Sequence, residues 1–197
     1  DLGTSWIDLN YNDDAWITGN GELGYGDGNE NTTVSYGSDS QNKYITTYFR
    51  KTFNLTENEL SANQYIINLL KDDGAVVYLN GKEIIRSNMG CDNITYQSYA
   101  ATVVSGDSES AFSSYTIDPE YFNEGVNILA VEIHQVSQTS SDISFDLELQ
   151  SFITDQGDLI SNVQSKTANP GNRVQQAKKA GEDRDSDLFG NRKLTAY

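Results

Sequence analysis

Carboxylates and a single histidine are the residues of this chain whose types and spacing could do chemistry. Glu132 and His134 are separated by one residue, and Asp72 and Asp73 are adjacent. A carboxylate beside a histidine raises the pKa of the imidazole and holds its ring through a hydrogen bond. Neighbouring carboxylates bind sugar hydroxyl groups or Ca²⁺, which takes oxygen ligands. These four residues are therefore candidate ligand-binding residues.

Each candidate also has a purely structural interpretation. Asp72 and Asp73 precede a glycine, where a turn uses aspartate oxygens to accept backbone N–H groups. His134 is the only histidine, so a zinc site would need carboxylates to complete it, and a packed histidine is the alternative. Arg50 and Arg86 could pair with these carboxylates or contact an anionic sugar, so Arg50 is a further candidate for the ligand site.

Aromatic residues around a glycine-rich segment form a second group of candidates. Tyr25, Tyr36 and Tyr44 flank or lie within residues 18–40, a polar stretch expected to be a long surface loop. The C–H face of a sugar ring packs well on an aromatic plane, so these tyrosines are expected to form an exposed platform. Trp16 is expected to lie in the core, as large apolar side chains usually do.

Signals for catalysis are sparse. The sequence contains no nucleophile elbow, zinc-binding histidine pair, phosphate-binding loop or Cys–His pair. Asp183, Asp185 and Asp187 alternate as in a calcium loop, but the glycine and glutamate of an EF-hand are missing, which favours solvated charge. We expect no enzymatic activity; a small hydrolase is the third hypothesis, because any acidic chain offers pairs of carboxylates.

The elements that must position these residues are short strands. Alternating or β-branched runs separated by turn residues predict an all-β sandwich or barrel up to residue 152. Asn80-Gly81 between two such runs predicts a tight hairpin. Asp118 and Pro119 predict one helical turn. The predicted strands are residues 44–53, 64–70, 75–79, 82–86, 99–104, 113–117, 127–135 and 143–149.

Composition changes near residue 153. The remainder is rich in Gln, Asn, Lys, Asp and Ser and has no repeated strand pattern. This composition is typical of a linker or an interaction tail. The sequence therefore predicts a β-sandwich module at residues 1–152 and an irregular polar tail at residues 153–197.

The net charge of the chain limits the kinds of partner that it can bind. The formal net charge of the chain is −16, from 13 basic and 29 acidic residues. Such a chain repels nucleic-acid phosphates and an anionic membrane surface, so neither is expected as a partner. No run approaches the ~18 apolar residues that a membrane-spanning helix needs. The single cysteine, Cys91, permits no disulfide within the chain, and this slightly favours a bacterial source for a secreted domain.

Seven short motifs occur in an order that resembles a known family. They are YNDDAW at 11–16, LGYGDG at 23–28, TTYFRKTF at 46–53, KDDGAVVYLNGK at 71–82, RSNM at 86–89, NILAVEIHQ at 127–135 and SSDISFDLEL at 140–149. Together they resemble a galactose-binding-like accessory domain of large secreted bacterial surface proteins and polysaccharide-degrading enzymes. The resemblance covers residues 1 to about 150 and excludes the tail.

The resemblance implies a jelly-roll sandwich, secretion to the cell surface, and attachment to a parent enzyme or surface protein. It also implies a structural Ca²⁺ that joins an early loop to the last strand, with Asp146 and a residue near Asp14 or Asp27 as ligands. The leading hypothesis is a non-catalytic module that binds a polysaccharide. The alternative is a structural or adhesive module whose tail contacts a neighbouring subunit.

Overall fold

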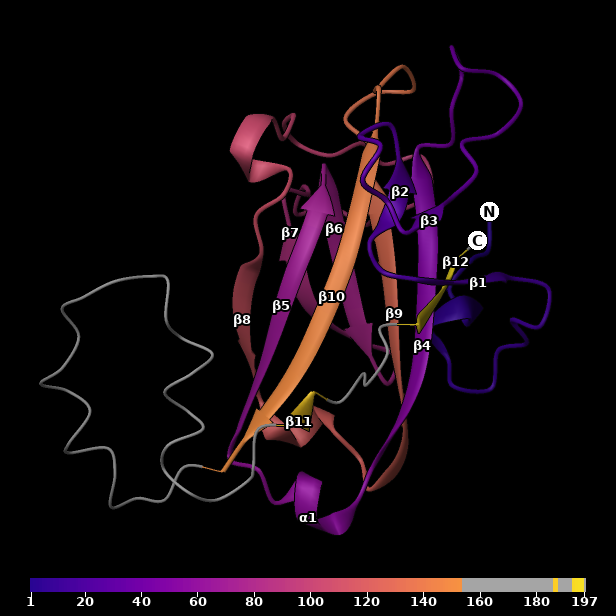
Figure 1. Cartoon of the computed structure of the whole chain (residues 1–197). Helices are drawn as coiled ribbons and strands as arrows, with labels where there is room; N and C mark the ends of the chain where they lie inside the picture. The colour runs from indigo at the N-terminus through magenta and orange to yellow at the C-terminus, as the bar shows by residue number, and fades with distance from the viewer. Residues whose placement is uncertain (154–185, 188–192, 197) are drawn as a thin grey trace, which may run out of the picture.

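Two β-sheets pack face to face in the computed structural model, which describes residues 1–153, 186–187 and 193–196 (Figure 1). The predicted all-β sandwich is confirmed. The first sheet has the strand order β1 (Ile17–Asn20), β12 (Lys193–Ala196), β4 (Thr46–Leu55), β9 (Gly125–His134), β6 (Gly74–Leu79) and β7 (Lys82–Ser87).

The second sheet has the strand order β3 (Thr32–Thr33), β2 (Leu23–Tyr25), β10 (Ile143–Phe152), β5 (Gln64–Asp72) and β8 (Ser113–Ile117), and β11 (Ser186–Asp187) also pairs with β10. All pairings are antiparallel except that of β2 with β3. The helical turns are α1 (Glu57–Leu60) and the 3₁₀ turns Ser5–Ile7, Gly106–Ser108 and Pro119–Tyr121.

Alternation along the long strands builds the core between the sheets. Ile143, Phe145 and Leu147 of β10 are almost fully buried and belong to the main hydrophobic cluster. Phe145 packs against Phe49 of β4 with 4.4 Å between the ring centroids. Because successive side chains point to opposite faces, Ser144 and its neighbours two residues away lie on the outer face of the second sheet.

A smaller hydrophobic cluster covers the outer face of the first sheet. Its members are Trp6, Trp16, Tyr48 and Ala130. Trp6 lies 4.6 Å from Tyr48 between ring centroids, so the N-terminal segment is packed onto β4 through aromatic contacts. The prediction that Trp16 is buried is confirmed.

The predicted Asn-Gly hairpin is present between β6 and β7. Asn80 and Gly81 have φ angles of 52° and 80°, as a turn of this kind requires. The Asn80 amide donates to the Tyr121 carbonyl at 2.9 Å and to Asn127 Oδ1 at 2.8 Å, and its Oδ1 accepts from Ile128 N at 3.1 Å. These bonds connect the hairpin to β9 and to the 3₁₀ turn Pro119–Tyr121, which precedes β9.

Two segments before residue 153 differ from the sequence predictions. Residues 99–104 form no strand, because their backbone bonds to other loops: Ala101 N donates to Asn88 O at 2.8 Å and Val104 N donates to Asp73 Oδ1 at 2.7 Å. Residues 18–40 are not one long loop, since β2 within them pairs with β10 and buries Leu23.

The polar tail supplies two short strands that its composition did not predict. β12 pairs with both β1 and β4, and β11 pairs with the end of β10. Asp183 and Asp185 lie outside the described residues. The domain boundary near residue 153 stays a prediction. Among the described residues, no helix has both the length and the apolar composition needed to cross a membrane.

Candidate functional site

Arg50 is a structural residue that fastens the N-terminal segment to β4. Its side chain is buried, and its Nε donates to Asp13 Oδ2 at 2.8 Å. Its Nη1 donates to the carbonyls of Trp6 and Asp8, and the guanidinium lies 5.2 Å from the centroid of the Tyr11 ring. The expectation that Arg50 pairs with the other candidate ligand residues is wrong, because the N-terminal segment supplies its partners.

Arg86 forms a surface ion pair with Glu83 of the same strand. Nη2 lies 2.7 Å from Glu83 Oε2, and Nη1 donates to the carbonyls of Gly90 and Asp92. Hydrogen bonding to Glu83 raises the pKa of Arg86. The suggested pairing of Arg86 with Asp72, Asp73 or Glu132 is therefore wrong, because the guanidinium pairs with Glu83, three residues away on β7.

Glu132 and His134 are adjacent, as their spacing suggested, and both are buried. Nε2 of His134 lies 3.3 Å from Glu132 Oε2. Its Nδ1 lies 3.0 Å from Thr46 Oγ1 and 2.7 Å from the Ser98 carbonyl. Glu132 Oε1 accepts from the Tyr78 hydroxyl at 2.8 Å. Burial, followed by the Glu132 charge, raises the pKa of Tyr78. This network matches the structural interpretation of a packed, hydrogen-bonded histidine.

Asp72 and Asp73 are adjacent buried carboxylates with different surroundings. Asp73 accepts from Val104 N at 2.7 Å and from Val136 N at 2.8 Å, so it accepts backbone N–H groups as predicted, but from two distant loops and not from the local turn that its sequence suggested. Asp72 is only 3% exposed, and its Oδ1 has no hydrogen-bond partner among the described residues. Nearby, Lys71 Nζ donates to the Asp73 main-chain carbonyl at 2.7 Å. Asp72 thus has a buried oxygen left over for another partner.

The surroundings of Asp72 are mainly acidic, with the Lys71 ammonium as a neighbouring positive charge. Burial contributes most to a rise in the pKa of Asp72 to about 8, and Asp73, Asp142 and Glu109 add to it. Asp72 lies directly opposite Ser144 in the β5–β10 register, so the two side chains share one face of the sheet. Ser144 Oγ donates to Asp27 Oδ2 at 2.9 Å. The unpaired oxygen of Asp72 therefore lies on the face where Asp27 is held.

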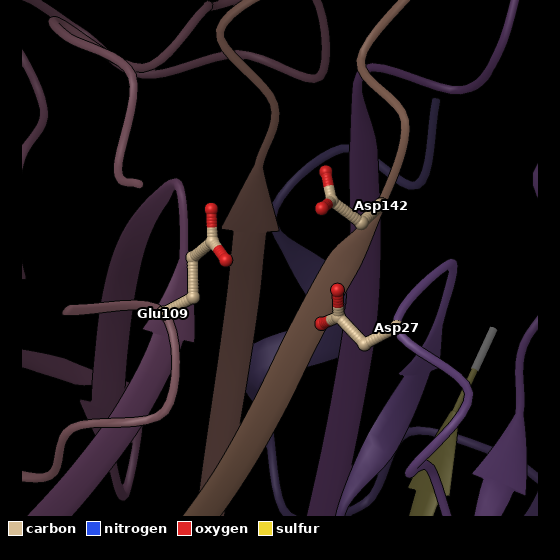
Figure 2. A group of neighbouring side chains, drawn as sticks. All are labelled: Asp27, Glu109 and Asp142. Atoms are coloured by element: carbon tan, nitrogen blue, oxygen red, sulfur yellow. The ribbon is translucent and has the colours of Figure 1, made fainter. Parts of the chain in front are cut away.

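Asp27, Glu109 and Asp142 converge beside this position, and we call them the acidic triad (Figure 2). One oxygen of each carboxylate lies within 4.8 Å of those of the others. Oxygen ligands of one calcium ion lie 2.3–2.6 Å from it, so two on opposite sides are about 5 Å apart. The triad could therefore hold a metal ion. Asp27 lies in the loop after β2, Glu109 directly follows the 3₁₀ turn Gly106–Ser108, and Asp142 directly precedes β10.

Only one of the three predicted metal ligands belongs to the triad. Asp14 is exposed on the N-terminal segment. Asp146 is buried, accepts from Leu147 N at 2.8 Å and lies against Gly21. The sequence did not single out Glu109, because it belongs to an ordinary polar loop. Asp142 directly precedes β10 and lies two residues before the outward-facing Ser144, so this spacing could have identified it from the sequence.

A cleft of about 650 Å³ opens on another part of the surface, between the N-terminal segment and β4. Pockets for small ligands commonly have volumes of 300–1,000 Å³. We call it the aromatic cleft, since its ring-bearing residues are Trp16, Tyr44, Tyr48 and Tyr96, and its amides are Asn42, Gln97 and Gln138. Tyr44 is 57% exposed and Tyr96 is 40% exposed, so both rings offer a face to solvent.

The predicted tyrosine platform is partly correct. Tyr44 lines the aromatic cleft, and Tyr36, which is 38% exposed and does not line it, accepts from Tyr44 N through its carbonyl at 3.0 Å. Tyr25 is buried, so its predicted exposure is wrong: Gln135 Nε2 donates to its hydroxyl, and Tyr36 packs edge-on at 5.2 Å. Burial raises the pKa of Tyr25 to about 12.

Lys43 lines the aromatic cleft, but its charge is used within the protein. Its side chain is buried, and Nζ donates to the carbonyls of Ser140 and Ser141. The ammonium group also lies 5.2 Å from the centroid of Tyr25 and 5.4 Å from that of Tyr36. The cleft therefore presents rings, amides and hydroxyls to a ligand in place of a free cation.

No protein-family model and no curated protein matches the chain. Similar solved structures include an α-L-rhamnosidase from Streptomyces avermitilis complexed with L-rhamnose, at 18% identity over 56% of this chain and 9% of that one, with a TM-score of 0.38. A β-glucuronidase of glycoside hydrolase family 2 is 20% identical over 68% of this chain and 12% of its own, with a TM-score of 0.41. A Pleurotus ostreatus lectin is 15% identical over 58% of this chain and 28% of its own, with a TM-score of 0.34. The chain thus spans about a tenth of the two enzymes.

Proposed function

We propose that the chain is a non-catalytic module that binds a neutral glycan in the aromatic cleft and belongs to a protein secreted to the bacterial cell surface. The observation that carries this proposal is the composition of the cleft. Exposed Tyr44 and Tyr96 supply ring faces for the C–H surface of a sugar, and three amide side chains supply donors and acceptors for its hydroxyl groups.

Charge favours a neutral glycan over an acidic one. The net charge of −16 repels polyanions, and a free cation in the cleft would be needed to overcome this repulsion. Lys43, the one cationic residue among the described residues that line the cleft, is occupied by two main-chain carbonyls. Arg50 is buried in its own network outside the cleft.

The cleft also favours binding over hydrolysis. Most glycoside hydrolases place two carboxyl groups across the scissile bond. Asp1 is the one carboxylate among the described residues that line the cleft. The acidic triad lies in loops and Asp72 lies opposite Ser144 of β10, and all four residues are absent from that lining. A module that binds without cleaving is the function that this distribution supports.

A structural Ca²⁺ held by the acidic triad is part of the proposal. Three carboxylates at ligand spacing and the unpaired buried oxygen of Asp72 support it independently of each other. A hard divalent cation satisfies such an all-oxygen set and offsets the repulsion among the carboxylates. Glu109 and Asp142 would then replace the predicted Asp14 and Asp146 as ligands beside Asp27.

Affinity electrophoresis through gels that contain neutral polysaccharides tests the glycan proposal. We expect a soluble β-glucan, xylan or galactomannan to retard the protein, and Tyr44→Ala to weaken binding roughly 2- to 12-fold through the lost ring contact. Tyr99→Ala is the matched control, because Tyr99 is 45% exposed and does not line the cleft. Equal loss in both variants, or no retardation on any gel, would contradict the proposal.

The second candidate is a structural or adhesive module, and the position of β12 favours it. This strand from the tail lies between β1 and β4, which shows that the sheet accepts an added strand at this place. In an assembly, a neighbouring copy would supply the same strand. Light scattering of the full chain at increasing concentration decides this: dimers or larger species support it, and a monomer at all concentrations excludes it.

A further inference from the structure

The loops that carry the acidic triad continue into both walls of the aromatic cleft. Asp27 follows β2, and the same connection leads through β3 to Thr33, Val34 and Ser35, which line one wall. Asp142 ends the connection between β9 and β10, in which Gln138 lines the cleft as well. The two features are therefore joined along the chain at both loops.

Direct contacts strengthen the connection through Asp142. Ser141 Oγ donates to Asp142 Oδ1 at 2.9 Å, and the carbonyls of Ser140 and Ser141 accept from Lys43 Nζ. Lys43 N donates to the Gln138 carbonyl at 3.1 Å. A single loop thus holds a triad carboxylate at one end and a cleft wall at the other.

The loop that carries Asp27 is in close contact with the same segment. A side chain on Gly26 would meet Asp142 Cβ at 2.6 Å, so the two backbones approach as closely as glycine permits. Val34 N donates to Gly24 O at 2.9 Å, which fixes the cleft wall to the strand that precedes Asp27. A displacement of Asp27 relative to Asp142 would therefore act on the segments that carry residues 33–35 and residue 138.

Charge supplies the force for this movement. Asp27, Glu109 and Asp142 repel one another without a cation, and Asp72 behind them has an oxygen without a hydrogen-bond partner among the described residues. A divalent cation reverses the sign of this interaction and draws the two loops together. We infer that a divalent cation bound by the acidic triad fixes the walls of the aromatic cleft, so that cation binding and glycan binding strengthen each other.

The inferred effect on glycan binding rests on the proposed function, whereas the inferred cation site rests on the acidic triad. Coupling between two sites is reciprocal: if the cation raises glycan affinity by a factor, the glycan raises cation affinity by the same factor. Couplings of this kind are typically 5- to 150-fold, and we expect at least roughly 5-fold here because two separate loops connect the sites.

The first experiment uses the full chain and calcium chloride alone. Isothermal titration should show binding that Asp142→Asn and Glu109→Gln each weaken at least about tenfold, since each removes one charged ligand. Asp107→Asn is the matched control: Asp107 is exposed two residues before Glu109 and lies outside the triad. No heat of binding, or equal weakening in the control, would overturn the cation site.

Hydrogen–deuterium exchange then tests the coupling without any glycan. Calcium should slow exchange at the Val34 and Lys43 amides, which form the hydrogen bonds of the two cleft walls. If exchange slows only in residues 26–31, 106–110 and 140–144, the cation orders only the loops that bind it. That result would overturn the coupling. Neither result depends on identifying a glycan.

Affinity electrophoresis with calcium or EDTA completes the test. Retardation by a neutral polysaccharide should weaken roughly 5-fold or more in EDTA, and Asp142→Asn should bind equally weakly in both buffers. Equal retardation of the unmodified protein with and without calcium overturns the coupling and leaves the glycan proposal standing. Absence of retardation in both buffers refutes the glycan proposal, and the exchange experiment then decides whether calcium orders the cleft.

Discussion

Arg50 and Asp72 are charged residues buried under opposite outer faces of the sandwich, and they differ in how completely they are paired. Arg50 is 2% exposed and bonds to Asp13 and to two main-chain carbonyls. Asp72 is 3% exposed, keeps one oxygen without a partner among the described residues, and has further carboxylates around it. Two equally buried charges thus occur in opposite electrostatic settings.

The difference separates a residue that stabilises the fold from one that is available to a ligand. A buried charge is tolerated when opposite charge and hydrogen bonds surround it, as around Arg50. A buried carboxyl among like charges holds its proton or takes a cation, and both options change with the solution. Dependence on pH and on metal is therefore expected at the Asp72 side.

Removing Arg50 should have the largest effect on stability. Arg50→Met leaves Asp13 and the carbonyls of Trp6 and Asp8 without their donor, and it loosens the N-terminal segment on β4. We expect the free energy of unfolding to fall by about 3 kcal/mol. Urea denaturation followed by tryptophan fluorescence measures this, because Trp6 packs in the affected cluster. If the free energy of unfolding falls by less than about 1 kcal/mol, Arg50 contributes no more to stability than an exposed charged residue does.

Replacing Asp72 should change the pH dependence of stability. Its pKa rises from 3.8 to about 8 on folding, so between these values the native state binds more protons than the unfolded state. Stability in EDTA should therefore fall as pH rises from about 4 to 8. Asp72→Asn should flatten this slope.

Denaturation midpoints of both proteins at pH 5 and pH 8 provide the measurement. The variant should gain most over the unmodified protein at pH 8, where the wild-type carboxyl loses its proton. Parallel pH profiles of the two proteins would show that the Asp72 charge is paired as completely as the Arg50 charge. The proposed difference between the two buried residues would then be wrong.

The exposed ion pair on β7 should contribute least. Glu83 and Arg86 are both partly solvated, and exposed pairs are worth about 0.2–1 kcal/mol. Glu83→Gln should therefore lower the free energy of unfolding by about 0.5 kcal/mol, and 1 M salt should remove most of the difference. A loss as large as that of Arg50→Met would mean that burial does not explain the difference between the charged residues.

Periodic features of the fold could be predicted from the sequence. Alternation over residues 143–149, the Asn80-Gly81 turn and the cap at Asp118 are local properties, and each occurs where it was expected. Residues 99–104 have strand composition but no partner strand, because their N–H groups are taken by loops. Leu23–Tyr25 lies among glycines, and its pairing with β10 depends on residues more than a hundred positions away.

The candidate sites were less predictable, because they depend on which loops meet. Glu109 joins Asp27 and Asp142 only through the packing of the 3₁₀ turn near the β10 entry, and no local pattern signals this. The buried position of Tyr25 follows from its neighbours Gln135 and Tyr36, which the tertiary structure supplies. Glu132 and His134 met as their spacing suggested, since a strand places residues two apart on one face.

The hydrogen-bonded Asn80 side chain also bears on how this protein ages chemically. An asparagine followed by glycine is prone to lose its amide when the next backbone nitrogen attacks the side-chain carbonyl carbon. In the hairpin, bonds to Tyr121, Asn127 and Ile128 hold the amide in place and oppose the rotation that this attack requires. Deamidation at Asn80 should therefore proceed mainly in unfolded molecules, and the isoaspartate content of a stored sample would record how long its molecules had spent unfolded.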